Sequence, residues 1–326
     1  MKAKHLFALM LLCGVVQVQA QAKAQSQTQP YPNKPITIII GSTPGSTSDG
    51  LARAIGAEIT KETGQAVIVD SKAGAFGGIA AQYVANAKPD GYTLFVTTNT
   101  TQAANPHLIK KLPYDPIKDF SPITKLVQGY MLLVTNPALK ANSVSELIAL
   151  AKKEPGKLTF GAGSSSARVA VELFEKMSGT EMVYVPYKSN PLAVMDLVGG
   201  QVDLMIVDLT TSLPQVKNEK LKALGVSSLT KSPLVPKLPT IASAGLPGYE
   251  FSHWNALYGP AGMDAATIKR INELFTSAMK KPTVKKFVEE NGMEVSVSTP
   301  DGLSAFQNAE LKRWGQIIKD AGIQPE

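Results

Sequence analysis

Two loops rich in hydroxyl side chains hold the residues best suited to binding chemistry. The first contains Ser46, Thr47, Ser48 and Asp49, between the apolar run 36–40 and a segment with helical periodicity. Such a junction offers hydroxyl donors, unpaired backbone N–H groups and the positive end of a helix dipole, which together suit a small anion such as a carboxylate. The same residues would also be explained if Ser48 or Asp49 only capped the next helix, and both alternatives stay open.

The second loop repeats this device in the other half of the chain. It contains Gly163, Ser164, Ser165 and Ser166, between a short strand predicted at 158–160 and a helix predicted at 167–178. The run 163–167 is one residue short of the Gly-x-Ser-x-Gly nucleophile motif. A serine hydrolase would need His107 or His253 beside one of these serines as a base, so this alternative is weak.

The sequence lacks the residue patterns of phosphate, dinucleotide and metal binding. The chain has no Gly-x-x-x-x-Gly-Lys phosphate loop, and the dinucleotide signature is incomplete after Gly161. No group of His, Asp and Glu has the spacing of metal ligands, and the single cysteine is Cys13. We therefore expect no metal, no cofactor and no catalytic residue.

The N-terminus has the organisation of a secretory signal peptide. A basic start is followed by the apolar run 6–16 and then by small and polar residues, which predicts a signal peptide over 1–24 and a disordered lead-in over 25–33. The apolar run is shorter than the roughly 20 residues that cross a bilayer. Leu12 before Cys13 argues against lipidation, and a mature chain without cysteine cannot form disulfides.

The net charge of +7 does not indicate a nucleic-acid partner. The lysines are scattered along the chain without an arginine-rich block, and an export signal takes the protein away from nucleic acid. We interpret the charge as a solvated surface that helps to gather anions.

Strands alternate with helices, which predicts an α/β fold with mostly parallel sheets. Strands are expected first at 36–40, 66–69 and 92–96, and later at 158–160, 182–185, 202–207 and 222–226. Two further strands, 123–127 and 131–134, would lead out of the first lobe. The proline-rich segment 233–247 would cross back. The first lobe would then be completed by helices 265–279, 283–291 and 302–321. Because ligands sit at the carboxyl ends of such strands, Thr98 and Asn99 join the candidate site.

Six motifs follow one another along the chain. They are Pro44-Gly-Ser-Thr-Ser-Asp-Gly-Leu-Ala-Arg53, Ala87-Lys-Pro-Asp-Gly-Tyr-Thr-Leu94, Leu112-Pro-Tyr-Asp-Pro-Ile-Lys-Asp-Phe120, Val185-Pro-Tyr-Lys188, Gly199-Gly-Gln-Val-Asp-Leu204 and Leu238-Pro-Thr240. Together they resemble the successive signatures of the tripartite tricarboxylate transporter solute receptors, the Bug or TctC family. The likeness extends over nearly the whole mature chain.

This resemblance implies a two-lobed, type II-like periplasmic binding protein in which each lobe is a mixed, mostly parallel sheet flanked by helices. Lobe 1 is expected to contain 34–128 and 253–326, and lobe 2 to contain 129–252. The implied function is that of a periplasmic, monomeric, non-enzymatic receptor that captures a small carboxylate, a dicarboxylate in the first place and an aromatic one as an option. Its implied partners are a large and a small membrane subunit. A sensor that docks on a signalling receptor is the alternative.

The resemblance also places the ligand between Ser46–Asp49 and Gly163–Ala167, and four departures from the family pattern bear on ligand choice. Ser46 stands where a glycine is usual and adds a hydroxyl donor. Phe76 also replaces a glycine, and it would either stack on a ring or fill space. Arg168 would grip a second carboxylate or lie in solvent. Asp208 replaces Asn and would accept from a ligand or cap a turn, whereas Trp254 fits core packing better than the pocket wall.

Overall fold

The opening segment shows how local sequence sets the first elements. The computed structural model describes residues 31–325, of which Lys34 onward forms one compact unit. Strand β1 (Ile36–Ile40) is rich in β-branched residues and is buried except for Thr37. Helix α2 (Thr47–Thr63) begins after the cap Ser46 and ends at Gly64, whose φ of 72° terminates it in the left-handed conformation.

The strands form two groups that share one long strand. In order they are β1, β2 (Val67–Ser71), β3 (Thr93–Thr98), β4 (Phe120–Thr135), β5 (Thr159–Ala162), β6 (Val183–Pro186), β7 (Leu204–Asp208), β8 (Lys222–Val226), β9 (Ser252–Pro260) and β10 (Met293–Val295). The sheet order is β2-β1-β3-β9-β4-β7-β5-β6, with β8 and β10 also paired to β4. Each group is mixed, with parallel pairs at β1, β2, β3 and at β5, β6, β7.

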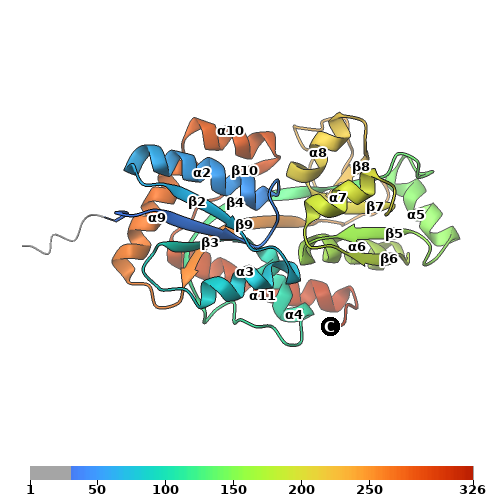
Figure 1. Cartoon of the computed structure of the whole chain (residues 1–326). Coiled ribbons are helices and arrows are strands. Elements are labelled where there is room, and N and C mark those ends of the chain that lie inside the picture. The colour runs from blue at the N-terminus through green and yellow to red at the C-terminus, as the bar shows by residue number, and fades with distance from the viewer. Residues whose placement is uncertain (1–30, 326) are drawn as a thin grey trace, which may run out of the picture. The chain divides into compact units, whose positions relative to one another are not determined.

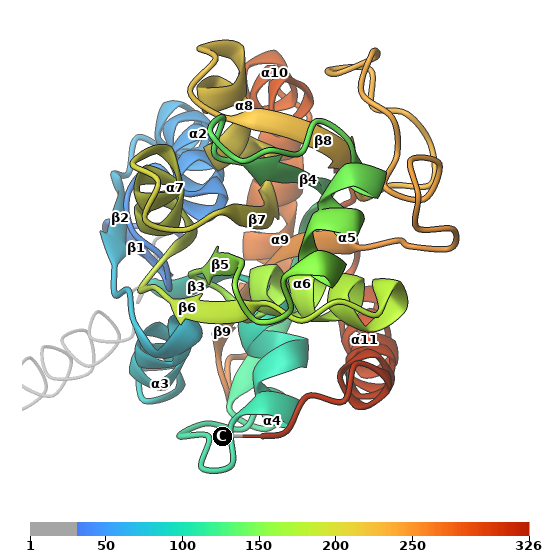
Figure 2. The same ribbon diagram turned by 90° about the vertical axis from the view of Figure 1, so that its right-hand side faces the viewer.

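Helices cover both faces of each group of strands. In order they are α2, α3 (Gly78–Ala85), α4 (Asn105–Leu108), α5 (Val144–Lys153), α6 (Ser165–Ser178), α7 (Asn190–Val198), α8 (Leu209–Lys217), α9 (Ala265–Met279), α10 (Pro282–Glu290) and α11 (Pro300–Asp320), with short turns η2 (Ala75–Gly77) and η3 (Thr100–Ala104). Figure 1 shows α2 and α10 on one side of the β1–β3 group and α3 and α11 on the other. In Figure 2, α5 and α6 lie on one side of the β5–β7 group and α7 on the other. This is the two-lobed α/β fold that the sequence predicts.

Strands β4 and β9 carry the chain between the two lobes. β4 pairs with β9 from Phe120 to Tyr130 and then with β7 from Met131 to Thr135, so its partner changes at one point. Next to that point, Gly129 faces His253, and a Cβ at Gly129 would lie 2.8 Å from the Nε2 of His253. The glycine therefore lets the histidine ring pack against the backbone where the lobes meet.

Three local expectations were wrong. The strands predicted at 123–127 and 131–134 are one strand, because β4 has pairing partners along its whole length. Helix α8 was not predicted, since its sequence contains Pro214 and adjacent threonines, yet Asp208 caps it. The segment 233–247 does not cross between the lobes, because Thr240 bridges back to Val226 of β8.

The signal peptide and most of the lead-in lie outside the described residues. Within 31–325, no helix is both long and apolar enough to cross a membrane.

Candidate functional site

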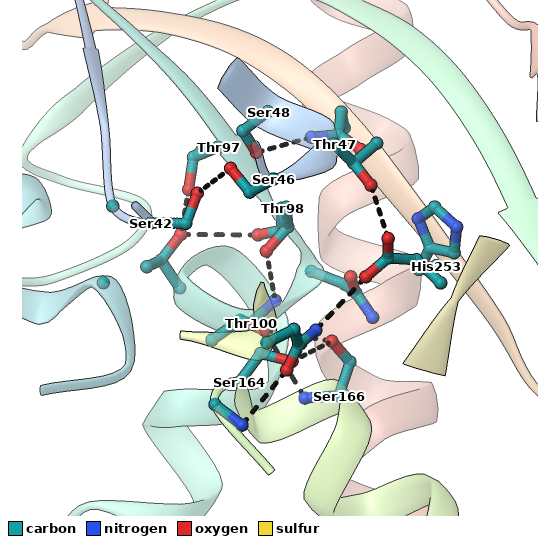
Figure 3. Close-up of a pocket in the computed structure, with 18 of the residues that line it drawn as sticks. Ser42, Ser46, Thr47, Ser48, Thr97, Thr98, Thr100, Ser164, Ser166 and His253 are labelled. Atoms are coloured by element: carbon teal, nitrogen blue, oxygen red, sulfur yellow. Dashed lines mark hydrogen bonds between the residues drawn. The ribbon is translucent and has the colours of Figure 1, made fainter. Parts of the chain in front are cut away.

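A cavity of about 80 Å³ lies between the two lobes at the carboxyl ends of their strands. Figure 3 shows hydroxyl side chains of lobe 1 above it and the Ser164 loop of lobe 2 below. Its lining comes from both lobes: Gly41, Ser42, Ser46, Thr47, Ser48, Phe76, Gly77, Val96, Thr97, Thr98, Asn99, Thr100, Thr101, Met131, Gly163, Ser164, Ser166, Asn190, Pro191, Asp208, His253 and Asn255. Hydroxyl and amide groups dominate this lining, as expected for a site that binds a small polar solute.

Four helices begin at the cavity. The N-caps Ser46 of α2, Ser164 of α6 and Asp208 of α8 line it, as does Asn190, the first residue of α7. Each helix start carries about half a positive charge and N–H groups without an intrahelical partner. These helix starts favour an anion without a cationic side chain, although the lining also includes the carboxylate of Asp208.

The lobe 1 loop is held by hydrogen bonds within itself. The hydroxyl of Ser46 accepts from the N–H of Asp49 at 3.3 Å, and it lies 2.6 Å from the hydroxyl of Ser42. The Asp49 carboxylate turns back to accept from the N–H of Gly45 and from Arg53. Ser46 is thus the cap, whereas Asp49 stabilises the loop and does not line the cavity.

The lobe 2 loop depends on a close backbone approach. The N–H of Gly163 donates to the side chain of Asn190 at 3.1 Å, and a Cβ at Gly163 would lie 1.9 Å from the carbonyl carbon of Ser189. The hydroxyl of Ser164 accepts from the N–H of Ala167 at 3.2 Å and caps α6. Only glycine at position 163 lets the starts of α6 and α7 lie this close together.

Side-chain hydrogen bonds join the two lobes across the cavity. They connect Thr43 with Ser189 (2.7 Å), Thr47 with Asp208 (2.9 Å), Thr100 with Ser166 (3.1 Å) and Ser165 with Asn105 (2.6 Å). Seven of the eight residues are at most 9% exposed. The lobes are therefore in direct contact, and the hydroxyls of Thr47 and Ser165 bind the opposite lobe.

Asp208 and His253 are the titratable residues of the cavity lining. Asp208 accepts from Thr47, from Asn190 and twice from Thr211. Burial lowers the pKa of His253 from its ordinary value of 6.5, although Asp208 and a hydrogen bond to the Tyr130 backbone act in the opposite direction. The histidine ring is therefore neutral at pH 7.

Two buried asparagines in the lining have side-chain atoms without a partner. Both amide atoms of Asn99 and the Oδ1 of Asn255 make no hydrogen bond, and both residues are completely buried. The Nδ2 of Asn255 donates to Ser48 at 2.9 Å. Because unpaired buried polar groups are costly, these atoms indicate a position for a ligand or for water.

Phe76 enters the lining from a strained loop. Ala75 and Phe76 have φ values of 46° and 49°, and Gly74 and Gly77 on either side also have positive φ. Such a conformation costs about 1–3 kcal/mol for a residue other than glycine. The carbonyl of Phe76 accepts from Asn105 at 3.1 Å, which holds this loop at the edge of the cavity.

The structure brings together most of the predicted site residues. Ser46, Thr47, Ser48, Phe76, Thr98, Asn99, Gly163, Ser164, Ser166 and Asp208 line the cavity, whereas Asp49, Ser165, Ala167 and Arg168 do not. The side chain of Arg168 pairs with Glu172 at 2.9 Å and lies over the ring of Tyr184. Trp254 lies in the core, where its indole donates to Glu310.

Several residues of the lining were not predicted to bind the ligand, among them Asn190, His253 and Asn255. Asn190 stands before a proline at the start of a helix after a strand, which is the same signal that identified the two serine loops. Asn255 is a polar residue in a strand whose nine residues are all buried, as are Ser252 and His253. A buried amide needs hydrogen-bond partners, and this need could have marked it as a binding residue.

The serines of the second loop have partners other than histidine. Ser165 donates to Asn105, Ser166 bonds to Thr100, and the ring of His107 bonds to the backbone of Leu311. The loop therefore does not have the hydrogen bonds of a nucleophile with its base.

The chain matches the model of a known protein family and is similar to several known proteins. The family model described as "Tripartite tricarboxylate transporter family receptor" matches residues 51–323. Protein BugT of Bordetella pertussis is 32% identical over 297 residues, which cover 90% of this chain and 91% of BugT. The R. palustris protein Rpa4515, solved with adipate, has a TM-score of 0.88 and 32% identity and covers 91% of this chain and 100% of its own.

A second solved structure is MatC from Rhodopseudomonas palustris with bound malate. Its TM-score is 0.84 and its identity 28%, over 88% of this chain and 100% of MatC. Each of these two similar structures contains a bound carboxylate.

Proposed function

The chain belongs to the tripartite tricarboxylate transporter receptor family, a family of periplasmic solute receptors rather than enzymes, and we propose that it captures a small carboxylate between its lobes. The solute is then delivered to a transporter with a large and a small membrane subunit. The protein acts as a monomer in the periplasm, after export through the N-terminal signal peptide. Its lobes comprise 34–128 with 253–326, and 129–252.

The convergence of four helix starts on one cavity carries this proposal. A carboxylate placed between the starts of α2 and α6 is held by backbone N–H groups and hydroxyls, with the dipoles of both helices directed at its charge. The candidate residues Ser46, Ser164 and Ser166 supply hydroxyl groups there, whereas the candidate Thr47 donates its hydroxyl proton to Asp208 and joins the lobes. Preorganised donors of this kind need no lysine or arginine.

The size of the cavity favours a small solute. A water molecule needs about 10–15 Å³ of such space, so the cavity of about 80 Å³ has room for roughly five to eight water-sized groups. This small volume favours a short-chain acid over a large ring system.

Lobe closure would couple binding to recognition by the membrane subunits. The hydrogen bonds between the lobes form only when β4 and β9 bring the two loops together, so they stabilise the closed state. A ligand that binds both lobes adds to the same equilibrium. A sensor that docks on a signalling receptor would use the same closed state, and only the partner distinguishes the two roles.

A thermal-shift screen tests the proposal, because a ligand that binds the folded state alone raises the melting temperature. The purified mature protein is heated with a panel of mono-, di- and tricarboxylates, with the corresponding amides as controls. We expect short carboxylates to raise the melting temperature and their amides to leave it unchanged. Equal shifts for acids and amides, or no shift for any acid, would contradict the proposed function.

A further inference from the structure

The charge of the cavity lining is unusual for a site that takes an anion. Among the lining residues no lysine or arginine occurs, and Asp208 is a carboxylate that is 8% exposed. Its contacts all come from donors: Thr47, Thr211 and Asn190. A carboxylate that meets only donors acts as an acceptor, as it does when ionised.

The two oxygens of Asp208 are used unequally. Oδ1 accepts from the Thr47 hydroxyl and from both the N–H and the hydroxyl of Thr211. Oδ2 accepts only from the side chain of Asn190, at 3.2 Å. Since each carboxylate oxygen has about two acceptor sites, Oδ2 keeps capacity for another donor.

No lysine or arginine in the lining pairs with Asp208. His253 is neutral at pH 7 because burial lowers its pKa. Arg168, the nearest arginine along the lobe 2 loop, pairs with Glu172 and stacks on Tyr184. The dipole of α8 acts on Asp208 as its cap, but a helix end supplies only about half a charge.

Further acceptors without partners lie in the same lining. The Oδ1 of Asn255 and both amide atoms of Asn99 make no hydrogen bond, and both residues are completely buried. With the Oδ2 of Asp208 the lining therefore offers three acceptors, of which one is charged, beside one neutral donor, the Nδ2 of Asn99. An ammonium group supplies three N–H donors and one positive charge.

We propose that the ligand is zwitterionic: its carboxylate binds at the starts of α2 and α6, and its ammonium group binds Asp208, as in a free amino acid. This inference rests on the proposed function and narrows its ligand class. A second carboxylate at the position of the ammonium would face Asp208 and be repelled, since a buried charge needs an opposite partner. An ammonium there leaves the buried pair neutral.

Calorimetry on the mature protein with matched acids tests this assignment. The pairs differ only in an amine: propionate and alanine, succinate and aspartate, glutarate and glutamate, hydrocinnamate and phenylalanine. A hydrogen-bonded charge pair distinguishes the amine by about tenfold or more, so the amino acid of the best-binding pair should bind at least that much more tightly. Malate, with a hydroxyl in place of the amine of aspartate, should follow succinate.

The variant Asp208→Asn keeps the shape of the side chain and removes its charge. We expect it to lower the preference for the amine to less than about threefold, since a neutral amide holds an ammonium only weakly. Asp203→Asn is the matched control, because Asp203 precedes β7 at its far end and accepts from Thr159 outside the cavity. It should retain the full preference.

The outcomes separate this inference from the proposed function. The ammonium assignment is overturned if succinate or malate binds as tightly as aspartate, or if any acid without an amine binds best. The protein would then still be a carboxylate receptor. Failure of every compound overturns both. If Asp208→Asn does not fold, N-acetylation of the preferred amino acid, which removes the positive charge, should abolish binding to the wild-type protein; retained affinity would overturn the assignment.

Discussion

Replacing Thr47 by valine removes one hydrogen bond between the lobes and keeps the shape of the side chain. The hydroxyl of Thr47 donates to Asp208 at 2.9 Å, and the two residues are 7% and 8% exposed. The bond joins the first turn of α2 to the cap of α8 and exists only when the lobes are closed. We therefore expect Thr47→Val to weaken ligand binding by lowering the population of the closed state.

The size of the effect follows from the partners of Asp208. A hydrogen bond to a charged group contributes about 1.5–3 kcal/mol. Asp208 keeps its donors from Thr211 and Asn190, so it does not become an unsatisfied buried charge. The lower end of the range, about 1.5 kcal/mol, then applies, and it corresponds to an increase in Kd of about tenfold.

Titration calorimetry with the acid that gives the largest thermal shift measures this change. Thr63→Val is the matched control, because Thr63 lies at the other end of α2 and donates only to the backbone of Ile59. The control should bind like the wild type. An unchanged Kd in Thr47→Val would refute the role of this bond in closure, and an equal loss in Thr63→Val would assign the effect to the stability of α2.

Two further predictions concern packing and pH. Gly163→Ala should lower the free energy of unfolding by about 3 kcal/mol, because its Cβ would overlap the backbone of Ser189; Gly199→Ala, with its nearest contact at 3.5 Å, should be tolerated in the same denaturant titration. Burial raises the pKa of Glu175 to about 7, so the native state binds more protons than the unfolded state and loses stability as the pH rises. The stability advantage of Glu175→Gln over the wild type should grow from pH 5 to pH 8 in thermal melts; an advantage independent of pH would contradict this.

Local sequence was sufficient to predict most of the fold. The β-branched run before Ser46 and the Gly-Ser loop before α6 gave the two junctions at the cavity, because strand propensity and helix capping depend on neighbouring residues. Helix α8 was missed for the same reason: Pro214 lowers its intrinsic propensity. The contacts of the folded chain override that propensity.

The details of the candidate site could not be predicted in this way. Thr47 and Asp208 are 161 positions apart and lie in different lobes, so their hydrogen bond depends on how the lobes close. Ser48 and Asn255 are 207 apart and meet only through the folding of lobe 1. The sequence therefore predicted that the hydroxyl residues bind the ligand. In the structure, some of these hydroxyl groups form hydrogen bonds between the lobes instead. The pairing of Arg168 with Glu172 follows from their i,i+4 spacing on α6, but the burial of this pair depends on tertiary packing.

Backbone groups at four helix starts bind the carboxylate, while side chains determine which carboxylate is preferred. The ligand specificity of the receptor can therefore be changed without loss of carboxylate binding. Main-chain N–H groups persist through almost any side-chain replacement, so the grip on a carboxylate does not depend on particular residue types. Selectivity then falls to a few side chains such as Phe76, Asp208 and Asn255. Varying these three positions together should yield receptors for new acids on an unchanged scaffold, which is a practical starting point for a biosensor.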